Sequence, residues 1–269
     1  MTAATVRFQA HRGGQEEAPE NTLAALRHAW GIPGAVPEVD VRTTRDRALV
    51  CLHDPTLART TDAADGICDA DVSTLLLEDV RKWDAGSHFS RRFCREHVPT
   101  FGDVAEELLA TDERRLYLDF KHVDPLFLEL VLGEGHLEDR VILTHADPAE
   151  LRRLRRAFPG IDTMTWCAGA PEVVVRRFDE LAASGFDGLT QVQVHLETTG
   201  ADPVTYALDE AFLVRAGRQL AAAGAALQVR PFAYDATSLR QLLDLGIHWY
   251  ATDAPARFAA CLAEAGYGP

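Results

Sequence analysis

The chain has 269 residues, a length that suits one α/β barrel or two smaller domains. Its 27 basic and 41 acidic residues give a net charge of −14, which disfavours nucleic acid and anionic lipid surfaces as partners. The net charge does not exclude an anionic small molecule as substrate, because a metal ion and a few basic side chains can make the electrostatic potential inside a cleft positive.

The five cysteines are scattered without a C-x-x-C pair, a pattern typical of reduced thiols in a cytosol. The first residues lack the features of a secretion signal, and no run approaches the roughly 18 apolar residues of a membrane span. We therefore expect a cytoplasmic protein without a membrane span, while its oligomeric state stays open.

The first predicted strand covers residues 6–11 and ends at Arg12 and two glycines, which permit a tight turn. A helix is predicted next, with Asn21 or Thr22 as its N-cap and Trp30 as its last residue. The first strand therefore ends in a turn that begins with a basic residue.

Segment 38–54, called the arm below, contains two alternating apolar runs joined by about four polar residues. A link that short cannot contain a parallel crossover, so the two runs are expected to pair as antiparallel strands. Glu38 and Asp40 then lie on one face of the first run. Because the chain folds back, His53 and Asp54 lie beside them, which indicates a divalent-cation site next to an acid or base.

Residues 55–100 show an irregular pattern, with an acidic stretch, one short helical turn and an arginine-rich loop at 91–93. The segment has too few apolar residues for an independent core. We therefore predict a single domain over 1–269, in which 55–100 forms a small insertion at the mouth of the main fold.

Helices and strands alternate from residue 101 onward. Helices are predicted over 101–110, 125–135, 148–158, 171–184, 209–223, 236–245 and 255–265, strands over 115–121, 140–145, 161–166, 186–195, 226–232 and 248–252, and a loop over 197–206. This alternation indicates parallel β-α-β units. Without the return strand of the arm, eight strands remain, each followed by a helix, which favours an α/β fold of the (β/α)8 TIM-barrel type. An open doubly wound sheet is disfavoured because no G-x-G-x-x-G follows the first strand.

Functional side chains of such a barrel lie at the carboxyl ends of its strands. Asp119 and Lys121 repeat the spacing of two seen in the arm, so both are expected to face the interior. Glu38, Asp40 and Asp119 then offer hard oxygen ligands for Mg²⁺ or Ca²⁺, with Mn²⁺ as an alternative, whereas zinc prefers more nitrogen or sulfur. The sequence therefore predicts a divalent cation as cofactor.

Two cations and two histidines complete the predicted site. Arg12 and Lys121 suit an anionic group, and the arginine can bind it with two hydrogen bonds. His11 and His53 come from different strands and suit the roles of general base and general acid. This combination indicates phosphoryl or phosphodiester chemistry on a small-molecule substrate.

Later strand ends supply candidates for substrate contact, namely His145, Trp166, Gln193, His195 and Arg230. Each faces the pocket only in one strand register, because a slip of one residue turns it outward. In the register that points them inward, Trp166 and His195 are predicted, with Arg12 and Lys121, as substrate-binding residues.

Several short motifs follow one another at characteristic spacing: His11-Arg12-Gly13, Pro19-Glu20-Asn21-Thr22, Glu38-Val39-Asp40-Val41, His53-Asp54, Arg59-Thr60-Thr61, Asp84-Ala85-Gly86-Ser87, Pro99-Thr100-Phe101 and Thr252-Asp253-Ala254-Pro255. Together they closely resemble the glycerophosphodiester phosphodiesterases, a family of phospholipase C-like phosphodiesterase barrels. The likeness covers residues 11–121 well and the rest chiefly at the last strand.

The resemblance implies a hydrolase of lipid metabolism that needs a divalent cation and converts glycerophosphodiesters to an alcohol and glycerol 3-phosphate. By the same resemblance, His11 and His53 are the catalytic pair and Arg12 binds phosphate. The residues that match the family's metal ligands are Glu38, Asp40 and Asp119, with Lys121 as the basic residue that follows.

The sequence departs from the family in two places. Asp119 stands where a glutamate is usual, and 228–232 replaces the frequent Trp-Thr-Val-Asn of the seventh strand. The leaving alcohol is therefore not predicted, and a lysophospholipid or another phosphodiester is an alternative substrate. A catalytically silent, metal-holding binding protein is a further alternative, which the intact pair of His11 and His53 disfavours.

Overall fold

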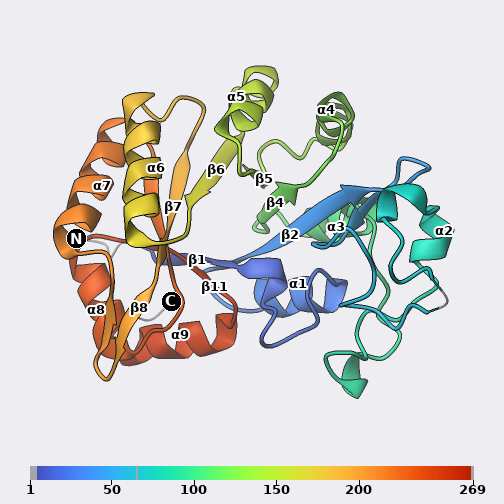
Figure 1. The fold of residues 1–269 in the computed structure, drawn as a ribbon, viewed down its shortest axis with the longest axis horizontal. Helices are drawn as coiled ribbons and strands as arrows, with labels where there is room; N and C mark the ends of the chain where they lie inside the picture. The colour runs from blue at the N-terminus through green and yellow to red at the C-terminus, as the bar shows by residue number, and fades with distance from the viewer. Residues whose placement is uncertain (1–4, 65, 268–269) are drawn as a thin grey trace.

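Eight parallel strands close into a barrel in the computed structural model, which describes residues 5–64 and 66–267. Strand β1 pairs with both β2 and β11, so the sheet has no gap, and the (β/α)8 TIM barrel predicted from the sequence is confirmed (Figure 1). The barrel strands are β1 (Arg7–Ala10), β2 (Ala35–Thr43), β4 (Leu116–Phe120), β5 (Val141–Thr144), β6 (Asp162–Cys167), β7 (Gln191–Leu196), β10 (Ala226–Pro231) and β11 (Trp249–Thr252).

Helices surround the barrel and begin at polar caps. Thr22 accepts a hydrogen bond from the backbone of Ala25 at 3.2 Å and starts the first helix, as predicted. The longer helices are α1 (Leu23–Trp30), α3 (Phe101–Leu109), α4 (Pro125–Glu134), α5 (Pro148–Ala157), α6 (Pro171–Ala183), α7 (Glu210–Ala222), α8 (Ala236–Asp244) and α9 (Pro255–Glu264). None of the helices in the described part of the chain has the length and apolar character needed to cross a membrane.

Strand alternation divides the side chains between the main core and the barrel interior. Leu116, Leu118 and Phe120 of β4 point outward and are buried in the main core beneath the helices. The residues between them, Tyr117 and Asp119, point inward, where Tyr117 belongs to a small apolar cluster and Asp119 lies one step nearer the carboxyl end. On β4, the polar group at the strand end therefore lies above a side chain of a small apolar cluster.

The arm has the predicted antiparallel geometry. Strand β3 (Leu49–Cys51) pairs with β2, with Val41 opposite Cys51 and Thr43 opposite Leu49. Just beyond β3, the backbone N–H of Leu52 donates to the carbonyl of Asp40 at 3.0 Å. The return strand is outside the closed barrel and places residue 53 at the level of Asp40.

The described residues of 55–100 pack around a small apolar cluster that includes Leu57, Val72 and Val80. Val50 and Leu52 of the arm complete this cluster, so the segment shares it with the arm. The segment contains η2 (Val72–Thr74), α2 (Leu77–Val80) and η3 (Arg91–Phe93), so 91–93 is a 3₁₀ turn and not loop. It lies to the right of the barrel in Figure 1, where it is drawn in cyan and green.

Two further predictions of local structure were wrong. Residues 197–206 form an antiparallel hairpin of β8 (Thr198–Ala201) and β9 (Val204–Tyr206), not a loop. Its strands are too short to show a clear alternating pattern, and Gly200 interrupts the first. Strand β7 starts at Gln191 rather than at 186, because 184–188 are a turn that follows α6.

We expect Gly13→Ala to destabilise the fold by about 3 kcal/mol or more, measured by urea unfolding. Gly13 has φ +78, and an added Cβ would lie 2.7 Å from Ala25 Cβ and 3.0 Å from the Ala25 backbone carbon. Gly224→Ala is the matched control, because Gly224 has φ +73 with nothing within 4 Å of an added Cβ. The control should lose only about 1–2 kcal/mol, and equal losses would contradict the packing argument.

Candidate active site

A cavity of about 340 Å³ opens at the carboxyl ends of the barrel strands. The nine residues predicted from the sequence as catalytic, substrate-binding or metal-binding all line it. They are His11, Arg12, Glu38, Asp40, His53, Asp119, Lys121, Trp166 and His195.

Three buried carboxylates, Glu38, Asp40 and Asp119, form the acidic triad at one side of this cavity. One oxygen from each lies within 4.8 Å of the others. Asp40 of β2 is the direct register partner of Asp119 of β4, which brings the two strands' acids together. Burial, Asp40 and Asp119 raise the pKa of Glu38 well above its ordinary value, and burial raises the pKa of Asp119. Like charges crowded in this way favour a bound cation.

Two side-chain cations partly neutralise the acidic triad. Lys121 Nζ lies 3.0 Å from Asp40 Oδ1 and donates to Asp119 Oδ2 at 2.5 Å. Arg12 Nε is 3.5 Å from Asp40 Oδ2, while the Arg12 backbone N–H donates to Glu38 at 2.6 Å. Burial alone would raise the pKa of Asp40, but Lys121 and other neighbours outweigh it, and the pKa of Asp40 is lowered. Arg12 and Lys121, the two cations predicted to bind substrate, thus also neutralise part of the charge of the triad.

Asn21 is part of this support and not only a helix start. Its Nδ2 donates to Asp40 Oδ2 at 3.0 Å, and its Oδ1 accepts from the Asp40 backbone N–H at 2.9 Å. Asn21 has φ +57, a left-handed conformation that asparagine tolerates better than most residues. The residue therefore orients one carboxylate of the acidic triad.

His11 is held from behind by Asp253. The Nδ1–H of His11 donates to Asp253 Oδ1 at 2.7 Å, and since a carboxylate only accepts, the proton is assigned to Nδ1 and Nε2 is left bare. Gln15 donates to the same carboxylate at 2.8 Å, and Arg230 Nη2 donates to both of its oxygens, at 3.0 and 2.8 Å. Burial lowers the pKa of His11, which is therefore neutral near pH 7.

His53 has a matching arrangement on the arm. Its Nδ1 lies 2.7 Å from Asp54 Oδ1, so its Nε2 is again the nitrogen left for other chemistry. Arg59 donates to Asp54 at 2.6 Å and binds both oxygens of Glu20, at 2.6 and 2.8 Å. Glu20 also accepts from Arg12 at 3.1 Å. A chain of ion pairs thus connects His53 to Arg12, the residue predicted to bind phosphate.

The remaining candidates divide between the cavity and its surroundings. Trp166, Gln193, His195 and Arg230 line the cavity, as the predicted registers require. His145 does not line it: the ring stacks on Phe120 with centroids 4.6 Å apart and lines a neighbouring hollow. Strand β5 ends at Thr144, so the residue after it has already turned away from the barrel axis.

Asp253 and Gln15 were not among the predicted site residues. Asp253 follows directly after β11 within the Thr252–Pro255 motif, and a carboxylate at that place was the available signal. Gln15 has no such signal, because it reaches Asp253 only through the turn after β1. Its role depends on a contact between residues 238 positions apart.

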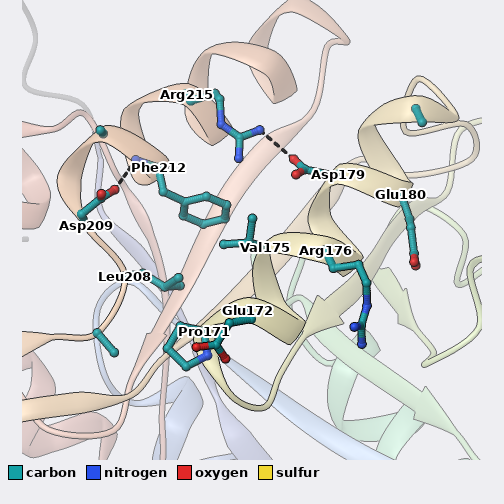
Figure 2. Close-up of a pocket in the computed structure, with 13 residues that line it drawn as sticks. Pro171, Glu172, Val175, Arg176, Asp179, Glu180, Leu208, Asp209, Phe212 and Arg215 are labelled. Atoms are coloured by element: carbon teal, nitrogen blue, oxygen red, sulfur yellow. Dashed lines mark hydrogen bonds and ion pairs between the residues drawn. The ribbon is translucent and has the colours of Figure 1, made fainter.

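A larger hollow, of about 1020 Å³, lies elsewhere, between α6 and α7 on the outer face of the helices (Figure 2). Val175, Leu208 and Phe212 form its apolar part, and Arg215 donates to Asp179 at 2.7 Å across its rim. It contains none of the predicted site residues. The chemistry of the side chains, and not the size of the hollow, therefore locates the candidate active site.

The acidic triad fits a hard divalent cation. Its donors are all carboxylate oxygens, which suit Mg²⁺, Ca²⁺ or Mn²⁺ and not zinc. Beside it, Arg12 Nε lies 3.5 Å from Asp40 Oδ2 and is buried without a hydrogen-bond partner in the described part of the chain. An unused donor beside a cation site suits a ligand rich in acceptor oxygens. The class is therefore a (β/α)8 barrel with a candidate site for cation-assisted acid–base chemistry.

The family model described as "Glycerophosphoryl diester phosphodiesterase family" matches residues 11–257. That match covers most of the chain, so the chain belongs to this family, as its motifs predicted. A curated relative, the glycerophosphodiester phosphodiesterase of Caldanaerobacter subterraneus subsp. tengcongensis, is 32% identical over 156 residues, which are 56% of this chain and 62% of the relative. The chain thus spans less than two thirds of that relative's length.

Solved structures share the fold. A glycerophosphoryl diester phosphodiesterase structure from Silicibacter pomeroyi, itself called putative, has a TM-score of 0.75 at 21% identity and covers 99% of this chain and 96% of its own. A phosphodiesterase from Oleispira antarctica, solved with its product sn-glycerol-3-phosphate, has a TM-score of 0.69 at 21% identity and covers 96% of both chains.

The Asp253 contacts predict a specific pH dependence of stability. Burial alone would raise the pKa of Asp253, but the hydrogen bond from His11 and the Arg230 cation hold it below its ordinary value. A carboxylate with a lowered pKa stabilises the fold above about pH 4 and loses this contribution as the pH falls through its folded pKa. The stability cost of Asp253→Asn should therefore be largest above pH 4 and shrink below it.

Urea unfolding of wild type and Asp253→Asn between pH 7 and pH 2.5 measures this cost. Asp112→Asn is the matched control, because the Asp112 side chain is fully exposed, and its cost should be small at every pH. A cost of Asp253→Asn that does not change with pH would contradict the contacts described.

Proposed function

We propose that the protein hydrolyses glycerophosphodiesters to an alcohol and glycerol 3-phosphate with the help of a divalent cation. The observation that supports this most is that two histidines, each bound through Nδ1 by a carboxylate, line the same cavity as the buried acidic triad. Family membership supports the reaction type, and the product named for the Oleispira structure supports the same product here.

In this proposal His11 and His53 move the protons. The lowered pKa of His11 leaves its Nε2 free to take the proton of the attacking hydroxyl or water. His53, held by Asp54, acts as the imidazolium ion in this proposal: it gives the proton on Nε2 to the oxygen of the leaving alcohol and keeps the proton on Nδ1. Both rings keep their orientation because a carboxylate fixes the nitrogen that faces away from the cavity.

Arg12 and Lys121 bind the phosphate in this proposal, and Trp166 and His195 contact the rest of the substrate. Glu38, Asp40 and Asp119 would hold the cation. The cation would supply positive charge near the phosphate oxygens, which gain negative charge in the transition state. Mg²⁺, Ca²⁺ and Mn²⁺ all suit such oxygen donors. A cytoplasmic location, a role in lipid metabolism and a single domain over 1–269 stay predictions from the sequence.

Cation binding has a direct test. Calorimetric titration of chelator-treated protein with Mg²⁺, Ca²⁺ or Mn²⁺ should show one site, and Asp40→Asn should weaken it at least about tenfold because a central ligand loses its charge. Asp112→Asn, at a fully exposed carboxylate, should bind as wild type does. Equal affinity in wild type and Asp40→Asn would exclude the acidic triad as the cation site.

Acid–base catalysis is tested by turnover of glycerophosphodiesters with the cation restored. His11→Ala and His53→Ala should each lower kcat at least about a hundredfold, the usual contribution of a positioned acid or base. His97→Ala is the matched control, since His97 is exposed and its ring contacts the Trp83 carbonyl, away from the cavity. Rates in His11→Ala and His53→Ala close to those of the control would overturn the proposed roles.

A further inference from the structure

A second polar wall of the cavity is formed by β7 and β10. His195 of β7 and Arg230 of β10 are direct register partners, so their side chains lie next to each other on the cavity face. Beneath them, Gln193 and Gln228 are buried register partners. We call His195, Arg230, Gln193 and Gln228 the β7–β10 wall.

The hydrogen bonds of this wall assign the proton of His195. Gln228 Nε2 donates to the Tyr250 carbonyl at 3.0 Å, so Gln228 Oε1 is the oxygen that accepts from Gln193 Nε2 at 2.6 Å. Gln193 must then present its own Oε1 to His195 Nε2, at 2.9 Å. An amide oxygen only accepts, so His195 carries its proton on Nε2, and its Nδ1 is an acceptor.

His195 stays neutral over the whole physiological range. Burial, the Arg230 cation and His11 lower the pKa of His195 to about 3. No hydrogen-bond partner of its Nδ1 is found in the described residues. The β7–β10 wall therefore offers a permanent, unused acceptor.

Arg230 offers the complementary donor. Its Nη2 is engaged by Asp253, at 2.8 and 3.0 Å, and its Nε is buried, whereas its Nη1 is neither buried nor hydrogen-bonded to any of the described residues. A donor and an acceptor on neighbouring strands match a hydroxyl group, because a hydroxyl accepts one hydrogen bond and donates another. A trimethylammonium group can do neither.

The charges of the cavity also disfavour a cationic alcohol. The only carboxylates among its described lining residues are the three of the acidic triad, whereas Arg12, Lys121 and Arg230 are all cationic. Phe232, whose ring edge meets His195 at 5.4 Å, already has the Arg230 guanidinium over its face at 5.4 Å. That face is therefore not free to bind an ammonium group.

We propose that the β7–β10 wall binds the leaving alcohol through His195 Nδ1 and Arg230 Nη1, and selects neutral polyhydroxylated alcohols over choline or ethanolamine. The preferred substrates would be diesters such as glycerophosphoglycerol and glycerophosphoinositol. This inference rests on the proposed function and adds to it the class of alcohol, which the sequence left open.

The test compares kcat/KM for glycerophosphoglycerol and glycerophosphocholine, using wild-type protein with saturating cation. Wild type should prefer the polyol ester at least about tenfold, the effect of one well-matched hydrogen bond. His195→Phe should remove most of this preference by raising KM for the polyol ester. His195→Asn keeps a polar atom near the Nδ1 position and should retain most of the preference.

His145→Phe is the matched control, because His145 follows a barrel strand but lies outside the cavity, and its substrate preference should equal that of wild type. Equal use of both esters by wild type, or a preference for the choline ester, would overturn the inference while the proposed function stands. An equal rise in KM for both esters in His195→Phe would also overturn it, since the wall would then bind the shared glycerol half. Hydrolysis of neither ester by wild type would overturn the proposed function itself. The wild-type comparison does not depend on the folding of any variant.

Discussion

The burial of three carboxylates within 4.8 Å of one another is the constraint on which the rest of the site depends. Unpaired charges of like sign inside a protein are costly, so every neighbouring element supplies compensation. Lys121 comes from the end of β4, Asn21 from the start of α1, and the backbone N–H of Arg12 from the turn after β1. The left-handed conformations of Arg12 and Asn21 are local strain that this compensation offsets.

The same turn connects the acidic triad to the contacts that hold His53. Arg12 touches Glu38 with its backbone and Glu20 with its side chain, and Glu20 is held by Arg59, which also holds Asp54 behind His53. On the opposite side, Asp253 holds His11. Asp253, which fixes His11, is distant from the triad in the sequence, whereas Asp54, which fixes His53, lies on the arm. A rigid mutual position of the two rings follows from these ion pairs and not from the barrel strands alone.

Much of this could be predicted from the sequence, because strand period and strand order decide which side chains meet. Glu38, Asp40 and Asp119 share an inward face by spacing alone, and a link of four residues in the arm is enough to bring His53 to them. Contacts that depend on long-range side-chain direction could not be predicted. Gln15 and Arg230 contact Asp253 from 238 and 23 positions away in the sequence, and no local pattern indicates those contacts. The β8–β9 hairpin was missed because its pairing is too short for periodicity to show.

The two halves of the cavity come from different parts of the barrel, and Arg230 joins them. The acidic triad and His53 belong to β2, β4 and the arm, where the family motifs are dense, whereas the β10 residues of the wall, Gln228 and Arg230, fall in the stretch that departs from the family pattern. Arg230 binds Asp253, which orients His11, and at the same time lies beside His195 on the wall. A change of alcohol that altered the position of Arg230 would therefore also alter the hydrogen bonding behind His11. If the proposed roles hold, one guanidinium therefore couples alcohol recognition to the proton transfer by His11.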